Sequence, residues 1–133
     1  MIAEFVEAWN LRWKEVAEAF SKQEPTSYLE IFTELVKILP ELDPKRITPI
    51  RYGGYEGRIV FVVAEKGYTP HLIFTTTVYY GSCSACDTLE RIRVDSSDKK
   101  KLQRIKDYTT LAMHMMQRMK SVDDNLPPPE EDV

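Results

Sequence analysis

The sequence predicts an α+β domain in which a small antiparallel β-meander packs against an N-terminal helix pair and a long C-terminal helix. Apolar residues recur every three or four positions before residue 40 and again after residue 98, as in amphipathic helices. Between these segments, residues 47–80 form β-branched, partly alternating runs separated by short glycine turns. Short turns join antiparallel strands, so we expect a meander here and not a doubly wound sheet.

The composition limits the class of protein. The 133 residues are enough for one domain with a hydrophobic core and too few for two. No apolar run approaches the roughly 20 residues that a membrane-spanning helix needs, and the first residues do not resemble a signal peptide. The net charge of -3 gives no general electrostatic case for nucleic-acid binding. Two cysteines are too few for a disulfide scaffold, so we expect a cytoplasmic protein.

Two helices are expected first. Residues 1–22 carry one apolar stripe, which packs in the core or forms a partner or dimer surface. That stripe consists of Ile2, Val6, Trp9, Trp13, Val16 and Phe20. Ser27 and Glu30 have capping-box spacing, so a second helix should begin near Ser27 and end before Pro40. Its buried face is expected to hold Ile31, Phe32, Leu35, Val36, Ile38 and Leu39.

Three strands should follow a loop marked by Asp43-Pro44. Pro49 confines residues 47–52 to a sheet edge, because proline cannot donate to a neighbouring strand. Arg58–Glu65 is apolar on both faces and should be central. Residues 71–80 form its partner. One face of that strand carries Leu72, Phe74, Thr76, Val78 and Tyr80, and the other carries His71, Ile73, Thr75, Thr77 and Tyr79.

The last third of the chain should be helical. Asp87 is expected to cap a short helix at 88–93, and residues 98–120 should form the long C-terminal helix. Its methionines, Met113, Met115, Met116 and Met119, should fill core gaps or form an adaptable interface. The domain is thus expected to span residues 1–122. Residues 123–133 are acidic and proline-rich, and we expect a flexible tail.

The candidate site is the strand-to-helix turn Gly81–Asp87, which contains both cysteines. Its backbone N–H groups and glycine favour an anion or a thiolate. The candidate residues for ligand binding or redox chemistry are Tyr80, Gly81, Ser82, Cys83, Ser84, Cys86, Asp87 and Arg91. The spacing from either cysteine to Arg91 differs from the Cys-x5-Arg of a phosphatase loop, which excludes that chemistry.

Four interpretations of this turn stay open. The first is structural, with the cysteines as small buried side chains or a local disulfide. The second is thiol–disulfide exchange, with Cys83 as nucleophile and Cys86 as resolving thiol, although the βαβ context of thioredoxins is absent. The third is a metal site, in which the pair supplies two of the four ligands of zinc. His71 and His114, or the cysteines of a second chain, would complete it.

The fourth interpretation is binding of a small ligand or anion by Ser82, Ser84 and the backbone N–H groups of the turn. Tyr79 or Tyr80 and Arg91 or Arg93 would lie nearby. A weaker alternative site is the basic segment Lys99–Lys106, which could contact the phosphates of a nucleic acid.

The segment Tyr80–Leu89 resembles a Tyr-Gly-Ser-Cys-Ser-x-Cys-Asp motif of small uncharacterised proteins encoded by phages and archaeal viruses. In those proteins glycine is usual where this chain has Ala85, and a Tyr-x-Gly hairpin like Gly54–Gly57 precedes the motif. The likeness covers residues 52–92. It implies a viral origin, an α+β fold and a place in the host cytoplasm, and it implies no reaction.

We therefore expect a small viral accessory protein that binds a partner at the Gly81–Asp87 turn. The sequence shows no set of nucleophile, base and orienting residue, so binding is favoured over catalysis. No cofactor is expected. The expected partners are a second copy of the chain, through an aromatic or methionine-rich helix face, and a host protein or small anionic ligand.

Overall fold

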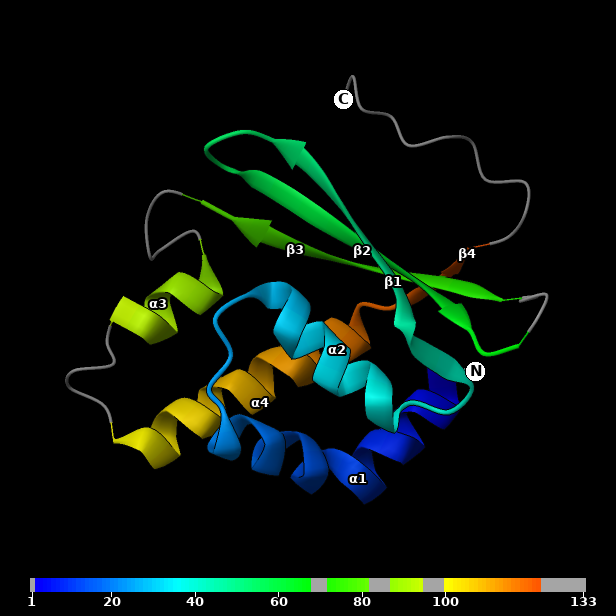
Figure 1. Ribbon diagram of the computed structural model, residues 1–133, viewed down its shortest axis with the longest axis horizontal. Helices are drawn as coiled ribbons and strands as arrows, with labels where there is room; N and C mark the ends of the chain where they lie inside the picture. The colour runs from blue at the N-terminus through cyan, green and yellow to red at the C-terminus, as the bar shows by residue number, and fades with distance from the viewer. Residues whose placement is uncertain (1, 68–71, 82–86, 95–99, 123–133) are drawn as a thin grey trace.

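A computed structural model describes residues 2–67, 72–81, 87–94 and 100–122. The elements are α1 (Ile2–Lys22), α2 (Tyr28–Ile38), β1 (Leu42–Gly53), β2 (Gly57–Glu65), β3 (Ile73–Tyr80), α3 (Thr88–Val94), α4 (Lys101–Gln117) and β4 (Lys120–Val122). The four strands form an antiparallel sheet in the order β1-β2-β3-β4, and the helices lie on one side of it (Figure 1). The predicted α+β class is confirmed.

The order of the strands agrees with the sequence pattern. β2 is central, and β1 is an edge strand in which Pro49 sits opposite Phe61. The expected loop at Asp43-Pro44 is wrong, because these residues belong to β1, where the register shifts between Leu42 and Ile47. The irregularity lets the strand continue past a proline that cannot join a regular ladder.

The predicted end of the last helix, at residue 120, is also wrong. α4 ends at Gln117, and residues 120–122 instead form β4, which pairs with β3. Met119 keeps its side chain in the core at 4% exposure while the chain turns toward the sheet. β4 then supplies hydrogen-bond partners to the edge of β3 that would otherwise be free.

The register sorts the strand residues into two faces, because directly opposite residues in an antiparallel pair share a face. The inner face carries Ile59, Phe61 and Val63 of β2, together with Phe74, Thr76 and Val78 of β3, all of them buried. The predicted grouping of Phe74, Thr76 and Val78 on one face of the 71–80 strand is therefore confirmed, and that face is the buried one. The outer face, which includes Tyr79, has no described helix over it (Figure 1).

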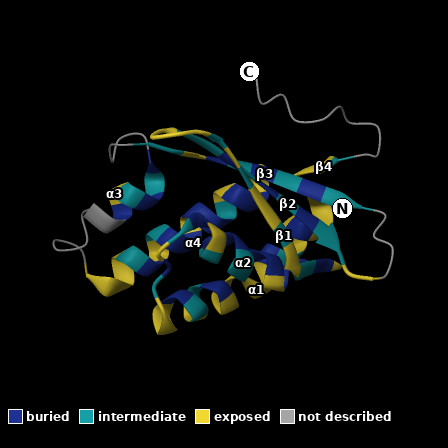
Figure 2. Cartoon of the chain, turned by 45° about the horizontal axis from the view of Figure 1, so that its top comes forward, coloured by how far each residue is buried: buried dark blue, intermediate teal, exposed yellow. Residues whose placement is uncertain are grey.

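The helices build the other half of the core. All six residues predicted for the buried face of α2 are buried. Figure 2 shows that α1 and α4 each have a buried side and an exposed side. The apolar stripe of α1 divides: Trp9, Val16 and Phe20 are buried, whereas Ile2, Val6 and Trp13 are 41%, 41% and 39% exposed, and the neighbouring Phe5 is buried instead. Three of the methionines, Met115, Met116 and Met119, are core residues.

Aromatic rings join the helical layer to the sheet. Phe5 of α1 meets Phe74 of β3 edge-on with 4.9 Å between ring centroids, and Phe32 of α2 stacks on Phe61 of β2 at 5.2 Å. These contacts fix how α2 lies across the sheet, which positions the N-terminus of α2 near the end of β3. Within the described ranges, no helix combines the length and the apolar character needed to cross a membrane.

Candidate functional site

Asp87 ties together the two ends of the predicted site segment. Its Oδ1 accepts a hydrogen bond from the Glu90 backbone N–H at 3.1 Å, which confirms Asp87 as the cap of α3. Its Oδ2 accepts from the Gly81 N–H at 3.3 Å, so the same carboxylate also holds the end of β3. The side chain is only 9% exposed. A buried carboxylate with several donors is a fixed structural centre for the turn.

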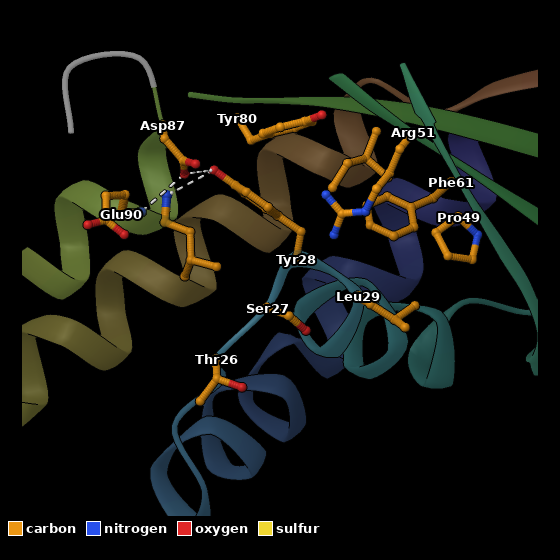
Figure 3. A pocket seen from close by; sticks show the side chains of 12 residues that line it. Thr26, Ser27, Tyr28, Leu29, Pro49, Arg51, Phe61, Tyr80, Asp87 and Glu90 are labelled. Carbon is orange, nitrogen blue, oxygen red and sulfur yellow. Dashed lines mark hydrogen bonds between the residues drawn. The ribbon is translucent and has the colours of Figure 1, made fainter. Parts of the chain in front are cut away.

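Tyr28 is the third partner of this carboxylate. As the first residue of α2 it follows the Ser27 cap, whose hydroxyl accepts from the Glu30 N–H. The Tyr28 hydroxyl donates to Asp87 Oδ1 and accepts from the Leu89 N–H at 3.0 Å (Figure 3). The Tyr79 carbonyl oxygen lies 3.4 Å from the same hydroxyl. The N-terminus of α2 therefore clamps both ends of the Gly81–Asp87 segment.

The ionisation of Tyr28 is suppressed. Burial raises the pKa of its phenol well above the ordinary value of 10.0, and the hydrogen bond to Asp87 raises it further. The hydroxyl therefore keeps its proton at physiological pH and acts as a hydrogen-bond donor, not as a base. This arrangement serves to position the turn.

A cleft of about 380 Å³ opens beside this cluster, between the N-terminus of α2, the hairpin end of the sheet and the start of α3 (Figure 3). Its lining combines apolar and polar side chains from segments far apart in the sequence. These residues are Thr26, Ser27, Tyr28, Leu29, Pro49, Arg51, Ile59, Phe61, Tyr80, Asp87, Leu89 and Glu90. The volume lies at the lower end of the range of small-molecule sites.

Arg51 is the positive charge of the cleft. It sits opposite Ile59 in the β1–β2 ladder and so faces the helical side of the sheet. Its guanidinium lies 5.5 Å from the centre of the Tyr80 ring, and Tyr80 donates its hydroxyl hydrogen to the Gly54 carbonyl at 3.1 Å. Among the residues that the structure describes, no carboxylate forms an ion pair with Arg51. Its N–H donors are thus available to a ligand.

The negative charges lie apart from Arg51. Figure 3 places Glu90 and Asp87 at the opposite end of the cleft, with Tyr28 between them and Arg51. Asp87 is already engaged by three donors from Tyr28, Gly81 and Glu90. The two ends of the cleft therefore differ in charge, and the Arg51 end is the one suited to an anion.

The structure brings together three of the residues predicted for the site: Tyr80, Gly81 and Asp87. Arg91 lies elsewhere, in a separate hollow of about 200 Å³ that is also lined by Asp107 and His114. Tyr79 points to the opposite face of the sheet and is 61% exposed. Ser82, Cys83, Ser84, Cys86 and His71 lie outside the described residues, so their predicted roles stay predictions.

Sequence reasoning missed Tyr28 and Arg51. The cap at Ser27 marked Tyr28 as the first residue of a helix, and the alternation with Pro49 put Arg51 on a definite strand face. Neither signal shows which segments meet at the end of β3. Among the described residues, no group of three or more His, Cys, Asp or Glu side chains is placed to hold a metal ion.

Comparison with protein families, with curated proteins and with solved structures finds no match to this chain. The function is therefore argued from the geometry of the site.

Proposed function

We propose that this protein is a binding protein, and that the cleft beside the Gly81–Asp87 turn takes a small ligand with a carboxylate or phosphate group. The observation that carries the proposal is Arg51, a cation at the cleft that no described carboxylate neutralises and that stacks on Tyr80. An arginine in this state offers several N–H donors in a planar fork, which matches the geometry of carboxylate and phosphate.

The rest of the cleft supports the same ligand class. Phe61, Pro49 and Leu29 give the Arg51 end apolar walls, which favour a ligand whose anionic group is attached to a compact apolar body. The contact with Tyr80 restricts the guanidinium before a ligand arrives, so less side-chain entropy is lost on binding. The Tyr28–Asp87 cluster forms the fixed far wall.

Binding is favoured over catalysis because the two buried ionisable side chains of the cleft, Tyr28 and Asp87, are already engaged. Tyr28 and Asp87 satisfy each other and the backbone of α3, and the raised pKa of Tyr28 keeps it from acting as a base. The hydroxyls of Thr26 and Ser27 bond to the Glu30 carboxylate as part of the cap of α2, and the described lining residues include no histidine that could act as a general base.

The test is a titration of ¹⁵N-labelled protein with benzoate and, separately, with inorganic phosphate. Resonances of the cleft should shift with saturable dependence on at least one probe, and Arg51→Gln should weaken that binding about tenfold or more. Arg91→Gln is the matched control, because it removes the same charge from an exposed arginine outside the cleft. Equal affinity in the two variants, or no saturable shift with either probe, would overturn the proposal.

The second candidate function is thiol–disulfide exchange or metal binding by Cys83 and Cys86. It is favoured by one observation, that Asp87 ties Gly81 to the start of α3 and so closes the ends of the segment that contains both cysteines. Mass spectrometry of native protein with and without reductant tests it. A bound zinc ion or a reducible two-proton mass difference would support this function, and thiols that resist alkylation would exclude it.

We also propose that two copies of the chain associate through the exposed side of α1 and α4. A groove of about 530 Å³ runs between these helices and is lined by apolar residues that include Trp13 and Leu102, which is 69% exposed. α1 carries four glutamates and three basic residues, whereas α4 carries three basic residues and one aspartate, so a two-fold arrangement that lays α1 of one copy on α4 of the other brings a net negative helix onto a net positive one. A light-scattering mass near 15.5 kDa at all concentrations would contradict it.

The cellular setting of the proposal comes from the sequence motif. We infer a viral accessory protein that acts in the host cytoplasm, where the cleft or the α1–α4 groove would meet a host component. Affinity capture from infected-host lysate with wild type and Arg51→Gln compares partners that depend on the cleft with partners that do not.

A further inference from the structure

The outer face of the sheet is an open surface that the proposed ligand cleft does not use. The helices pack on the other face, and none of the described segments lies over this one (Figure 1). Val60 and Val62 of β2 are only half-buried at its centre, and Tyr79 at its hairpin end is 61% exposed. A sheet with one face left open is a frequent platform for ligands that lie flat.

Aromatic and basic side chains form one row across this face. Tyr52 of β1, Arg58 of β2 and Tyr79 of β3 are directly opposite one another in the two ladders. The Arg58 guanidinium lies 4.9 Å from the centre of the Tyr52 ring. Neighbouring strands are about 4.8 Å apart, so the backbones of the two tyrosines are about 10 Å apart, with Arg58 on the strand between them.

The charge of this face differs from the charge of the whole chain. Five of the 21 acidic residues and none of the 18 basic residues lie in 123–133, which leaves residues 1–122 with 18 basic and 16 acidic residues. Of the paired strand positions that face outward, none holds Asp or Glu, whereas Arg58 and Lys120 are basic. Arg58 has no ion pair with a carboxylate in the described part of the chain. The open face is locally positive.

We propose that the open face of the sheet binds single-stranded nucleic acid, with bases stacked on Tyr79 and on the Tyr52–Arg58 pair and with phosphates contacting Arg58 and Lys120. Aromatic rings accept any base by its flat face, and an arginine plane that lies on a ring accepts one in the same way. Arg58 at one end of this face and Lys120 at the other, with no acid at the paired outward positions between them, add the attraction for the phosphate backbone. Both requirements are met on the same face of the sheet.

The observations favour nucleic acid over a protein partner at this face. A protein interface of the stable kind has an apolar centre with few charges, whereas here an arginine with no described carboxylate partner lies between the two tyrosines. The half-buried valines leave only a modest apolar area. The surface therefore suits a ligand that combines flat rings with negative charge.

The test is fluorescence anisotropy of the full chain with labelled 12-nucleotide oligo-rU and oligo-dT at 50 and 200 mM salt. We expect binding of one or both oligonucleotides that weakens at the higher salt. Tyr79→Ala should weaken it roughly tenfold, because stacking on an aromatic ring is worth about 1–3 kcal/mol per base, while Tyr79→Phe should bind like wild type. Tighter binding of oligo-rU would identify RNA as the ligand. Equal affinity for the two oligonucleotides would mean that the face contacts only bases and phosphates.

The matched control removes a positive charge elsewhere. The control variant is Lys101→Gln. Lys101 lies at the start of α4, in the basic segment that could itself contact phosphates. Arg58→Gln should weaken binding more than Lys101→Gln and should lower its dependence on salt. No binding at 50 mM salt, or a greater loss from Lys101→Gln, would overturn the proposal. The proposal would also be overturned if light scattering showed that the wild type is a dimer and that the Tyr79→Ala variant is a monomer. Arg51→Gln should leave oligonucleotide binding unchanged, so this test is independent of the ligand cleft.

Discussion

Replacing Tyr28 by phenylalanine removes one hydroxyl from the centre of the Asp87 cluster and leaves the ring in place. The Leu89 N–H loses its acceptor, and the Asp87 carboxylate loses one of its donors. An unsatisfied buried donor costs about 1–3 kcal/mol, and a hydrogen bond to a charged group contributes about 1.5–3 kcal/mol. These two costs overlap because one hydroxyl makes both hydrogen bonds, and phenylalanine leaves no cavity of consequence. We therefore expect the free energy of unfolding to fall by about 2–4 kcal/mol. That is a large share of the usual 5–15 kcal/mol.

The measurement is urea unfolding followed by the fluorescence of Trp9 and Trp13, both in α1. The midpoint should fall with little change in the slope, since the native state keeps its compactness. Tyr80→Phe is the control, because its hydroxyl bonds to the exposed Gly54 carbonyl and its loss should cost less than about 1 kcal/mol. A Tyr28→Phe variant as stable as Tyr80→Phe would refute the structural role given to the cluster.

The same variant tests the pKa of Tyr28. A phenol whose pKa is raised on folding contributes stability that is complete below its unfolded value of 10.0 and is lost as the pH rises toward the folded value. Wild type should therefore lose stability above pH 10 more steeply than Tyr28→Phe. The difference in the free energy of unfolding between the two proteins cancels the contributions of the lysines and the other tyrosines that titrate in the same range. Parallel curves would show that Tyr28 is not protected in the native state.

Two further predictions concern how the fold is held. Arg104 donates to Glu24 at 2.8 and 2.9 Å and holds the pKa of Glu24 below its ordinary value of 4.5. A double-mutant cycle on the pair should give a favourable coupling at pH 7 that disappears as the pH falls below 4.5, because Glu24 is then protonated; a coupling independent of pH would contradict the ion pair. Gly57→Ala would place a Cβ 2.0 Å from the Tyr52 carbonyl oxygen and should cost more than about 3 kcal/mol. Gly54→Ala meets no atom within 4 Å and should change thermal stability little.

Much of the fold could be predicted because the signals are local. The cap at Ser27 and the period of the apolar residues fix α2, and the alternation along β3 separates Phe74 from Tyr79 before any packing is known. Asp87 could be predicted as a cap for the same reason, because a capping side chain bonds to the backbone N–H groups that immediately follow it. Each of these features is decided within about four residues of chain.

The rest depended on contacts between distant segments. β4 is three residues long and continues a helical pattern, so only the free edge of β3 makes residues 120–122 a strand. Tyr28 carries no local sign that its hydroxyl would reach Asp87 across the fold. A buried polar cluster of this kind is satisfied by tertiary packing, and sequence spacing does not encode it.

The end of β3 explains why two separate binding surfaces arise from adjacent residues. Tyr79 and Tyr80 point to opposite faces of the sheet, so one faces the open surface near Arg58 and the other supports Arg51 in the cleft. The net charge of the chain averages over both surfaces and over the acidic residues 123–133, and for that reason it did not reveal the positive face. Because the Tyr28 hydroxyl contacts the Tyr79 carbonyl and the Asp87 carboxylate, the clamp that orders the cleft also fixes the backbone from which Tyr79 projects.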